Sequence, residues 1–420
     1  MDVKKISIGR NKNIYIKKSK KFKTIGLSFV YKMKYDHKLV TAFNVLAKYL
    51  GNCSLDYPGI EKLNKYIESL YGTTIGIKTN YSGSLFAFNI FANIVNPKFV
   101  EDKNLIEKVI EIIYKMIYRP LIIDDALDEN IFNICKENCM IDTESLNEFN
   151  MGYIIRSLKN SISNNPYNSF VTPQLGNQKV LKKLDNYNII KYYKKLLNAP
   201  IDIYVTGDFK VNEMVNIIKK YFKQHKAKSF KYDVFDMIDT KVVEPTIIKK
   251  QVSQAKVAVL YKIPVLFNDD RHYAFRLARL VLSGTLSSKL SKVIREEMGL
   301  CYFINSVYSS YYGSFIVTTG VASENIDKVV KEIDNQIKSL QNGDLTDEEF
   351  MQAKEAILSD MISIDDSLFG TLNMIKTYSN FNQDFVLEDE MRKYEKVSKE
   401  DIIEVSKLLT YCTYAALDKE

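Results

Sequence analysis

An arginine and a tyrosine seven residues apart, Arg295 and Tyr302, are the side chains in this sequence best suited to act on a carbonyl group. Apolar residues recur before them at helical spacing: Leu286, Leu290, Val293 and Ile294. Gly299 fits the position just past a helix end, and a strand-like run follows it. Because the intervening turn is short, we expect Arg295 and Tyr302 to lie close together. A guanidinium and a phenol on rigid elements can donate hydrogen bonds to a carbonyl or a developing oxyanion.

The segment around this pair resembles part of a known family. The run "REEMGLCY", with "SGTLSSKLSKVI" before it and "SSYYGSFIVTTG" after it, is similar to the C-terminal half of the M16 zinc peptidases. That family includes mitochondrial processing peptidase and insulin-degrading enzyme. Its members use an Arg and a Tyr at this spacing to contact the substrate across a chamber from the metal, so the resemblance implies that role for Arg295 and Tyr302. The alternative is structural: Arg295 would pair with Glu296 or Glu297, and Tyr302 would be a half-buried strand residue.

The composition indicates a globular protein of two domains. The chain has 420 residues, which suits two cores better than one, and 46% of them are hydrophobic. The net charge is +8, but the basic residues are mostly lysines spread along the chain. Because no arginine-rich helix, aromatic RNA-binding strand or basic tail occurs, we expect no nucleic-acid partner. The sequence has neither an apolar leader nor a membrane-length apolar run, so we expect no membrane partner and a cytoplasmic location.

The five cysteines are Cys53, Cys135, Cys139, Cys301 and Cys412. Their odd number and wide scatter do not indicate a disulfide framework. Cys135 and Cys139 are four residues apart in a helical pattern, but no second ligand pair exists to complete a metal site, so we expect both in the core. Cys53 has no evident histidine beside it and is interpreted as a packing residue rather than a nucleophile.

The order of the expected elements indicates an internal repeat. The first half begins with a strand within 23–33, continues through helices, a hairpin over 73–95 and more helices, and ends with a strand at 200–208 and a helix at 211–222. The second half repeats this order with a strand at 253–265, helices at 270–284 and 287–298, a hairpin over 301–321, helices at 325–340 and 346–364, and a final strand at 410–418. The run Thr346–Glu349 has the form of a capping box.

These patterns predict an α+β protein of two homologous two-layer α/β domains, each a mostly antiparallel sheet covered by helices. We expect an N-terminal domain over 1–225, a linker over 226–240 and a C-terminal domain over 241–420. The resemblance implies the LuxS/MPP-like metallohydrolase fold, with the chain forming half of a clamshell. The segments "SGSLFAFNIF" and "YGSFIVTTG" are candidate sheet edges for an extended peptide, and the alternative is that both are sheet interior.

The family's zinc motif is missing from this sequence. Active members carry H-x-x-E-H on the first helix of the first domain, where two imidazoles bind zinc and the glutamate activates water. Counting back from Gly51, which matches a family glycine, the corresponding positions are Ala42, Val45 and Leu46. None of these side chains binds a metal or accepts a proton. We therefore expect no cofactor in this chain and zinc in a partner subunit.

The chain has three histidines, and none lies within a helical turn of another. His37 follows the first strand, where we expect a solvated loop residue, with contact to substrate as the alternative. His225 falls in the lysine-rich linker and is expected at the surface. His272 opens a helix and is expected to be partly exposed.

Retention of the Arg–Tyr pair without the zinc motif indicates a divided enzyme. We expect a non-catalytic subunit of a heterodimeric M16-type peptidase, which supplies Arg295 and Tyr302 to a homologous zinc-bearing partner that cleaves peptides. The run "LYGTTIGIKTNYSG" and the chain length resemble the zinc-less member of bacterial pairs named for association with elongation factor P modification. The alternatives are a non-enzymatic peptide-binding or scaffold protein, in homodimeric form or alone, and an enzyme of another class.

Overall fold

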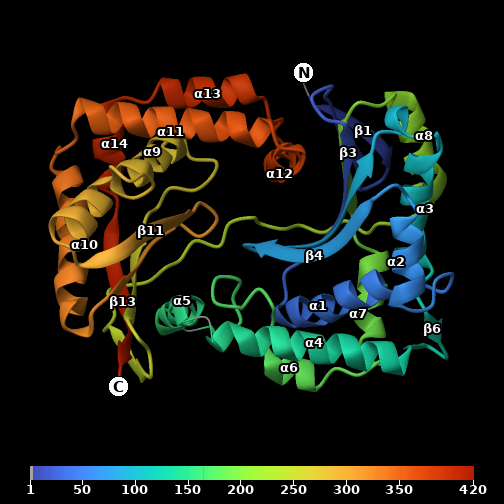
Figure 1. Ribbon diagram of the computed structural model, residues 1–420, viewed down its shortest axis with the longest axis horizontal. Coiled ribbons are helices and arrows are strands. Elements are labelled where there is room, and N and C mark those ends of the chain that lie inside the picture. The colour runs from blue at the N-terminus through green and yellow to red at the C-terminus, as the bar shows by residue number, and fades with distance from the viewer. Residues whose placement is uncertain (1–2, 149, 164) are drawn as a thin grey trace. The chain divides into compact units, whose positions relative to one another are not determined.

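The computed structural model describes residues 3–148, 150–163 and 165–420. These divide into two compact units, and Figure 1 labels several of the helices and strands that build them. Unit 1 comprises Met1–Thr143, Thr172–Val234 and Ile364–Val386, and unit 2 comprises Glu144–Val171, Phe235–Ser363 and Leu387–Glu420. Each unit is thus discontinuous in sequence, which differs from the expected boundaries at 225 and 241.

Unit 1 is built around a six-stranded sheet in the order β1-β2-β8-β3-β5-β4. The strands are β1 (Lys4–Gly9), β2 (Lys12–Lys18), β3 (Thr24–Lys34), β4 (Thr74–Ser82), β5 (Leu85–Val95) and β8 (Ile201–Gly207), with β6 (Ile122–Ile123) and β7 (Ala126–Leu127) in a separate small hairpin. The helices are α1 (His37–Asn52), α2 (Ile60–Glu68), α3 (Leu105–Tyr118), α4 (Glu129–Glu148, whose end is counted with unit 2), α6 (Gln178–Lys182), α7 (Ile190–Leu197), α8 (Val211–Phe222) and α12 (Leu368–Ser379), with a 3₁₀ turn at Pro97–Phe99.

Unit 2 is built around a five-stranded sheet in the order β11-β12-β10-β13-β9. The strands are β9 (Thr246–Lys250), β10 (Ala255–Lys262), β11 (Cys301–Ser309), β12 (Ser314–Val321) and β13 (Thr410–Lys419). The helices are α5 (Asn150–Ser161), α9 (His272–Leu282), a π-helix at Ser291–Glu297, a 3₁₀ turn at Ser323–Asn325, α10 (Ile326–Gln341), α11 (Asp347–Asp365, whose end is counted with unit 1), α13 (Leu387–Glu395) and α14 (Lys399–Ser406). The capping box at the start of α11 is confirmed, because Thr346 Oγ1 accepts from the Glu349 N–H and Glu349 Oε2 accepts from the Thr346 N–H.

The two sheets confirm the predicted repeat. In unit 1 five neighbouring strands have the order β2-β8-β3-β5-β4, and in unit 2 the order is β9-β13-β10-β12-β11. Strands at the same place in the two sheets also follow one another in the same order along the chain. The parallel pair in each is also the same: β2 with β8 and β9 with β13. The other neighbours are antiparallel, so both sheets are the mostly antiparallel α+β kind that the sequence predicts.

Each half of the sequence gives one helix to the unit built mainly from the other half. The helix α12 packs on β3 and β8 in unit 1, where Tyr204 Oη lies 2.7 Å from Ser379 Oγ. Gly26 of β3 permits this close approach, since a Cβ there would lie 2.9 Å from a Leu372 methyl carbon. In the same way, α5 packs on β10 and β13 in unit 2, with Ile154 and Leu158 buried.

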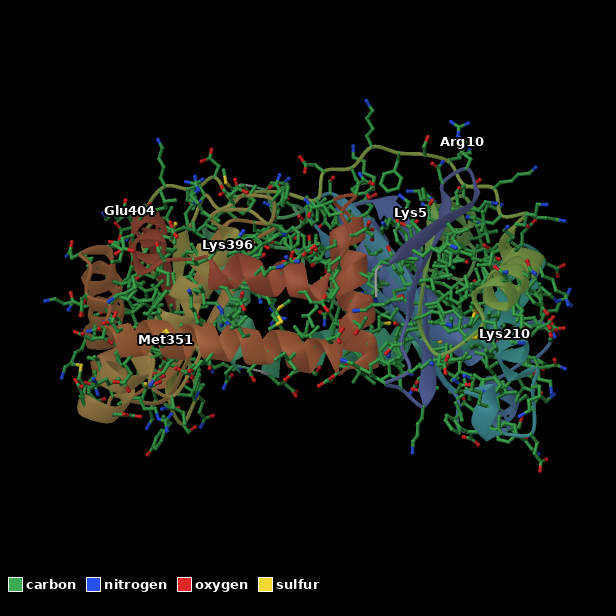
Figure 2. All side chains as sticks on the ribbon, turned by 90° about the horizontal axis from the view of Figure 1, so that it is seen from above. Lys5, Arg10, Lys210, Met351, Lys396 and Glu404 are labelled. Carbon is green, nitrogen blue, oxygen red and sulfur yellow. The ribbon has the colours of Figure 1, made fainter. Side chains whose placement is uncertain are left out.

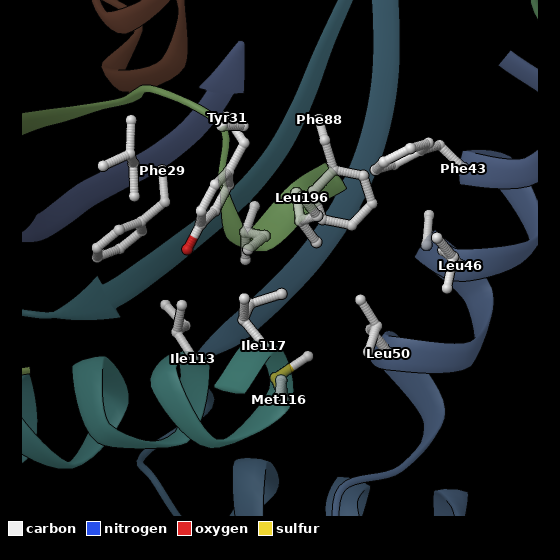
Figure 3. Close-up of a cluster of buried hydrophobic side chains, with 14 of the residues drawn as sticks. Phe29, Tyr31, Phe43, Leu46, Leu50, Phe88, Ile113, Met116, Ile117 and Leu196 are labelled. Carbon is white, nitrogen blue, oxygen red and sulfur yellow. The ribbon is translucent and has the colours of Figure 1, made fainter. Parts of the chain in front are cut away.

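The core of unit 1 lies between the sheet and the helices α1, α3, α7 and α8. Figure 3 shows aromatic side chains of the sheet, including Phe29, Tyr31 and Phe88, facing Leu46 of α1 and Ile113 of α3. Burial of these rings and branched side chains supplies the main stabilisation of the unit. Charged side chains lie at the outside, as Lys5, Arg10 and Lys210 do in Figure 2.

Candidate functional site

Arg295 lies on a short π-helix at Ser291–Glu297, just before β11. The helix is anchored by the buried side chains of Leu290 and Ile294, and Met298 caps its end. Gly299 follows the cap, and its φ of 62° is the left-handed conformation predicted for the residue after a helix. The N–H of Met298 bonds to the carbonyl of Val293, a spacing of five residues. Local π-helical turns are frequent at functional sites.

The start of the predicted helix is different from the expectation. Residues 283–288 form turns, and Leu286 is 71% exposed rather than part of an apolar face. Ser288 donates a hydrogen bond to the carbonyl of Thr285, which competes with helical bonding in this stretch. Lys289, which is buried, then fixes the helix start through ion pairs with Asp344 at 3.0 Å and Glu349 at 3.2 Å.

Tyr302 is the second residue of β11, the edge strand of the unit 2 sheet. Its side chain is 86% exposed, so the alternative of a half-buried strand residue does not hold. Within the described residues, no carboxylate oxygen lies within 4.0 Å of the Arg295 guanidinium, so its pairing with Glu296 or Glu297 is not observed. Both side chains are therefore open to a ligand.

The two residues line the same hollow, which has a volume of about 660 Å³. Its other walls come from the start of β10, the end of β12, the turn before α10 and the end of β13. Lys419 and Arg295 contribute positive charge, and Glu324 is the one acidic residue among the lining residues. A hollow with net positive charge and exposed N–H and O–H donors suits a carbonyl oxygen or a carboxylate.

Cys301 lies between these two residues in sequence, and its side chain is buried. Burial raises its pKa, although a hydrogen bond with Thr319 and the charge of Arg295 act in the opposite direction. The other four cysteines are also free and buried. The core interpretation of Cys135 and Cys139 and the packing interpretation of Cys53 are thus confirmed.

The expected zinc-motif positions face the core of unit 1. Ala42, Val45 and Leu46 lie on α1, and each is fully buried. In Figure 3, Leu46 points into the same cluster as Phe43 and Leu50. These three positions therefore pack the helix onto the sheet and do not border a site.

A neighbouring face of α1 does border a hollow. Asn44, Ala47 and Lys48 have the same i, i+3, i+4 spacing as the motif, two residues further on, and line a hollow of about 340 Å³ together with Asp142 of α4. Lys48 Nζ lies 3.0 Å from Asp142 Oδ2. The positions counted back from Gly51 thus lie two residues before those on the face of α1 that borders the hollow.

This donor set does not fit zinc. Asparagine and alanine replace an imidazole and the general base, and a lysine ammonium, which is a cation with no lone pair, stands at the last position. Burial by itself lowers the pKa of Lys48, but the hydrogen bond and charge of Asp142 raise it overall, so the ammonium form persists. Over residues 3–148, 150–163 and 165–420, no group of three or more His, Cys, Asp or Glu is placed to hold a metal ion.

The histidines differ from their predicted settings. His225 is buried, not exposed: Nε2 donates to the Ala199 carbonyl at 2.7 Å, and the Tyr118 hydroxyl lies 2.9 Å from Nδ1. His272 is also buried, and burial followed by the charge of Arg276 lowers its pKa to about 3. His37 is the first residue of α1 rather than a loop residue.

The candidate sheet edges were assigned to the wrong strand of each hairpin. "SGSLFAFNIF" contributes to β5 and "YGSFIVTTG" to β12, and both strands lie inside their sheets. The edges are their hairpin partners, β4 and β11. In the structure, β12 is buried throughout, whereas exposed residues recur along β11.

Comparison with known proteins shows what the chain is similar to. The Peptidase M16 inactive domain matches residues 183–357. The chain is 24% identical over 392 residues to the probable inactive metalloprotease YmfF of Bacillus subtilis (strain 168), covering 93% of this chain and 91% of that protein.

Solved structures share the fold over the whole chain. A conserved protein from Enterococcus faecalis V583 superposes with a TM-score of 0.92 at 24% identity, covering 100% of this chain and 99% of that one. A peptidase M16 inactive domain from Pseudomonas fluorescens superposes with a TM-score of 0.79 at 13% identity, covering 100% and 98%. Among the described residues, no helix is both long and apolar enough to cross a membrane.

Proposed function

Because residues 183–357 match the Peptidase M16 inactive domain and the sequence lacks the zinc motif, we propose that this chain is the non-catalytic subunit of a heterodimeric zinc metallopeptidase. The observation that carries the proposal is the open pair of donors: Arg295 and Tyr302 line one hollow, and among the described residues neither is engaged by a carboxylate or by the core. A purely structural role does not require an exposed phenol beside an unpaired guanidinium.

The two side chains have different tasks in this proposal. Arg295 holds a main-chain carbonyl of the peptide and fixes its register. Tyr302 donates its hydroxyl hydrogen to the oxygen that becomes negatively charged when water attacks the scissile carbonyl. The homologous partner holds zinc, which activates that water.

The peptide reaches this site along the free edge of β11. An edge strand presents unpaired backbone N–H and C=O groups, so an extended peptide can add as a further strand. Tyr302 and Val307 both project from β11 and are strongly exposed, which provides apolar contact for alternate side chains of the peptide. Strand addition of this kind recognises the backbone of the peptide more than its side chains.

The test is reconstitution with a zinc-bearing homologue from the same genome. Each chain alone and the mixture are assayed with a quenched fluorescent peptide library, and association is measured by light scattering after gel filtration. We expect cleavage only by the mixture. Arg295→Ala and Tyr302→Phe should each lower kcat by about 100- to 1000-fold while leaving association unchanged.

Matched substitutions control for general effects. Tyr187→Phe and Arg392→Ala change exposed residues of the same types and should leave turnover unchanged. If the chains associate but the Arg295 and Tyr302 variants cleave normally, the role in trans is wrong. If the chains do not associate and this chain alone binds peptide, it is a peptide-binding or scaffold protein.

A further inference from the structure

A second hollow in unit 1 is lined by lysines and apolar side chains that have no part in the proposed peptidase role. It has a volume of about 670 Å³ and lies where the end of β3 meets α7 and the segment 228–230. Met33, Leu39 and Ala199 are buried at its floor, and Phe230 is half-buried at its wall. A backbone hydrogen bond joins two of its walls: the N–H of Lys228 donates to the carbonyl of Asn198 at 2.9 Å.

The rim of this hollow is strongly basic. Besides Lys32, five exposed lysines line it: Lys34, Lys191, Lys194, Lys195 and Lys228. Asp36 is the acidic residue among the lining residues, and its carboxylate has other partners. It caps α1 by accepting a hydrogen bond from the Lys38 N–H, and it lies 3.5 Å from His37 Nδ1. Lys32 is neutralised by Asp202 at 2.7 Å.

These five lysines lack the acidic partners that lysines elsewhere in the unit have. Lys220 pairs with Glu107 at 2.7 Å, and Lys108 pairs with Asp102 at 2.6 Å. In contrast, no carboxylate oxygen of the described residues lies within 4.0 Å of any lysine in the group of five. Like charges held close together repel each other, so the arrangement is stabilised when an anion joins it.

Local structure explains part of the group. Lys194 and Lys195 are in the last turn of α7, where cations interact favourably with the helix dipole. Lys191 and Lys195 lie over the ring of Tyr192, at 4.9 and 5.7 Å from its centroid. Neither effect accounts for Lys34 and Lys228, which come from two other segments and face the same hollow.

We propose that this hollow binds an acidic segment of a polypeptide, with one apolar side chain on the floor and carboxylates against the lysines. The apolar floor favours a peptide over an inorganic or nucleic-acid phosphate. None of the described residues that line the hollow is an arginine, so they do not offer the planar guanidinium that binds a phosphate with two parallel hydrogen bonds. Flexible lysines around an apolar floor suit several separated carboxylates.

The test measures binding of a short fluorescein-labelled peptide, rich in glutamate and containing one phenylalanine, to the full chain by anisotropy. Replacing its glutamates with glutamine, replacing its phenylalanine with serine, and competing with tripolyphosphate form the other arms. We expect the labelled peptide to bind at low ionic strength and more weakly at physiological ionic strength, because exposed charges are screened. The glutamine peptide should not bind, and the serine peptide should bind more weakly.

Matched triple variants locate the binding. We expect about tenfold weaker binding when three rim charges are removed, as for the loss of three exposed ion pairs. The rim variant is Lys191→Gln, Lys194→Gln and Lys228→Gln. The control removes the same charge from exposed positions elsewhere in unit 1: Lys62→Gln, Lys65→Gln and Lys183→Gln. Circular dichroism melts of both variants check folding.

Three outcomes overturn the proposal. One is equal binding by the rim and control variants, and another is no peptide binding at any ionic strength. The third is tripolyphosphate binding that displaces the peptide completely and is tighter than it, which would assign the hollow to a phosphate. None of these results bears on Arg295 or Tyr302, so the peptidase proposal is tested separately.

Discussion

Tyr204 Oη and Ser379 Oγ lie 2.7 Å apart, although 175 residues separate them in the sequence. The bond joins β8, from the first half of the chain, to α12, from the second half. Before the start of α12, Asp365 forms ion pairs with Lys17 and Lys21 at 2.8 and 2.6 Å. A segment from the second repeat therefore completes the first unit, and this relationship determines how the chain should respond to truncation and mutation.

Leu372→Ala should destabilise unit 1. Leu372 is fully buried against Gly26, so truncating it leaves a cavity, and we expect the free energy of unfolding to fall by about 3 kcal/mol. Asn373→Ala, at an exposed position of the same helix, should change it by less than about 0.5 kcal/mol. Urea unfolding followed by circular dichroism measures both. A fragment ending at residue 240 should be less stable still, and equal stability of that fragment would contradict this account.

Installing the zinc motif in two registers should give opposite results. Asn44→His, Ala47→Glu and Lys48→His place the motif on the face that borders Asp142, so we expect about one equivalent of zinc by metal analysis and titration calorimetry. Ala42→His, Val45→Glu and Leu46→His place the same three side chains in the core, where buried polar groups without partners should unfold unit 1. Zinc binding by the second variant would show that the register assigned to α1 is wrong.

Acid should weaken the fold through His272. Its pKa is about 3 in the fold against an ordinary 6.5, so the unfolded chain binds a proton first as the pH falls. The stability that neutral His272 provides is complete above pH 6.5 and is lost as the pH falls from 6.5 towards 3. We expect a slope of about 1.4 kcal/mol per pH unit from this residue. His272→Gln should flatten the dependence, and His37→Gln, which removes a smaller lowering of the pKa, should flatten it less. An imidazole signal of His272 that titrates near pH 6.5 by NMR would disprove this.

The cysteines should be unreactive in the native protein. Burial raises the pKa of Cys53 and of Cys139 to about 12, and it raises the pKa of the other three thiols as well. The thiolate is the reactive form of cysteine. We therefore expect a disulfide reagent at neutral pH to react rapidly with less than one thiol per molecule of folded protein. All five should react in denaturant. Rapid labelling of Cys301 in the native state would mean that the Arg295 hollow opens further than the structure indicates.

The sequence predicted the elements of the site better than their surroundings. The turn at Gly299 and the strand start at Cys301 follow from local chemistry, because a left-handed residue ends a helix whatever packs around it. The burial of His225 and His272 was missed, since both stand in polar stretches that reach the interior only through packing. The edge strands were missed for a similar reason. Either strand of a hairpin can pair with the next strand of the sheet, and only the complete sheet shows which of the two is left at the edge.

By itself, the sequence determined the repeat, the α+β class and the absence of an H-x-x-E-H run, because these depend on periodicity and residue type along the chain. Tertiary structure alone decided which face of α1 borders a hollow, which strands are edges, and that α5 and α12 complete units formed mainly by the other half. It also decided that Lys34, Lys191 and Lys228 share one rim. Such relationships join residues far apart in sequence, and the free energy that selects them comes from burying specific surfaces against each other, which no local pattern encodes.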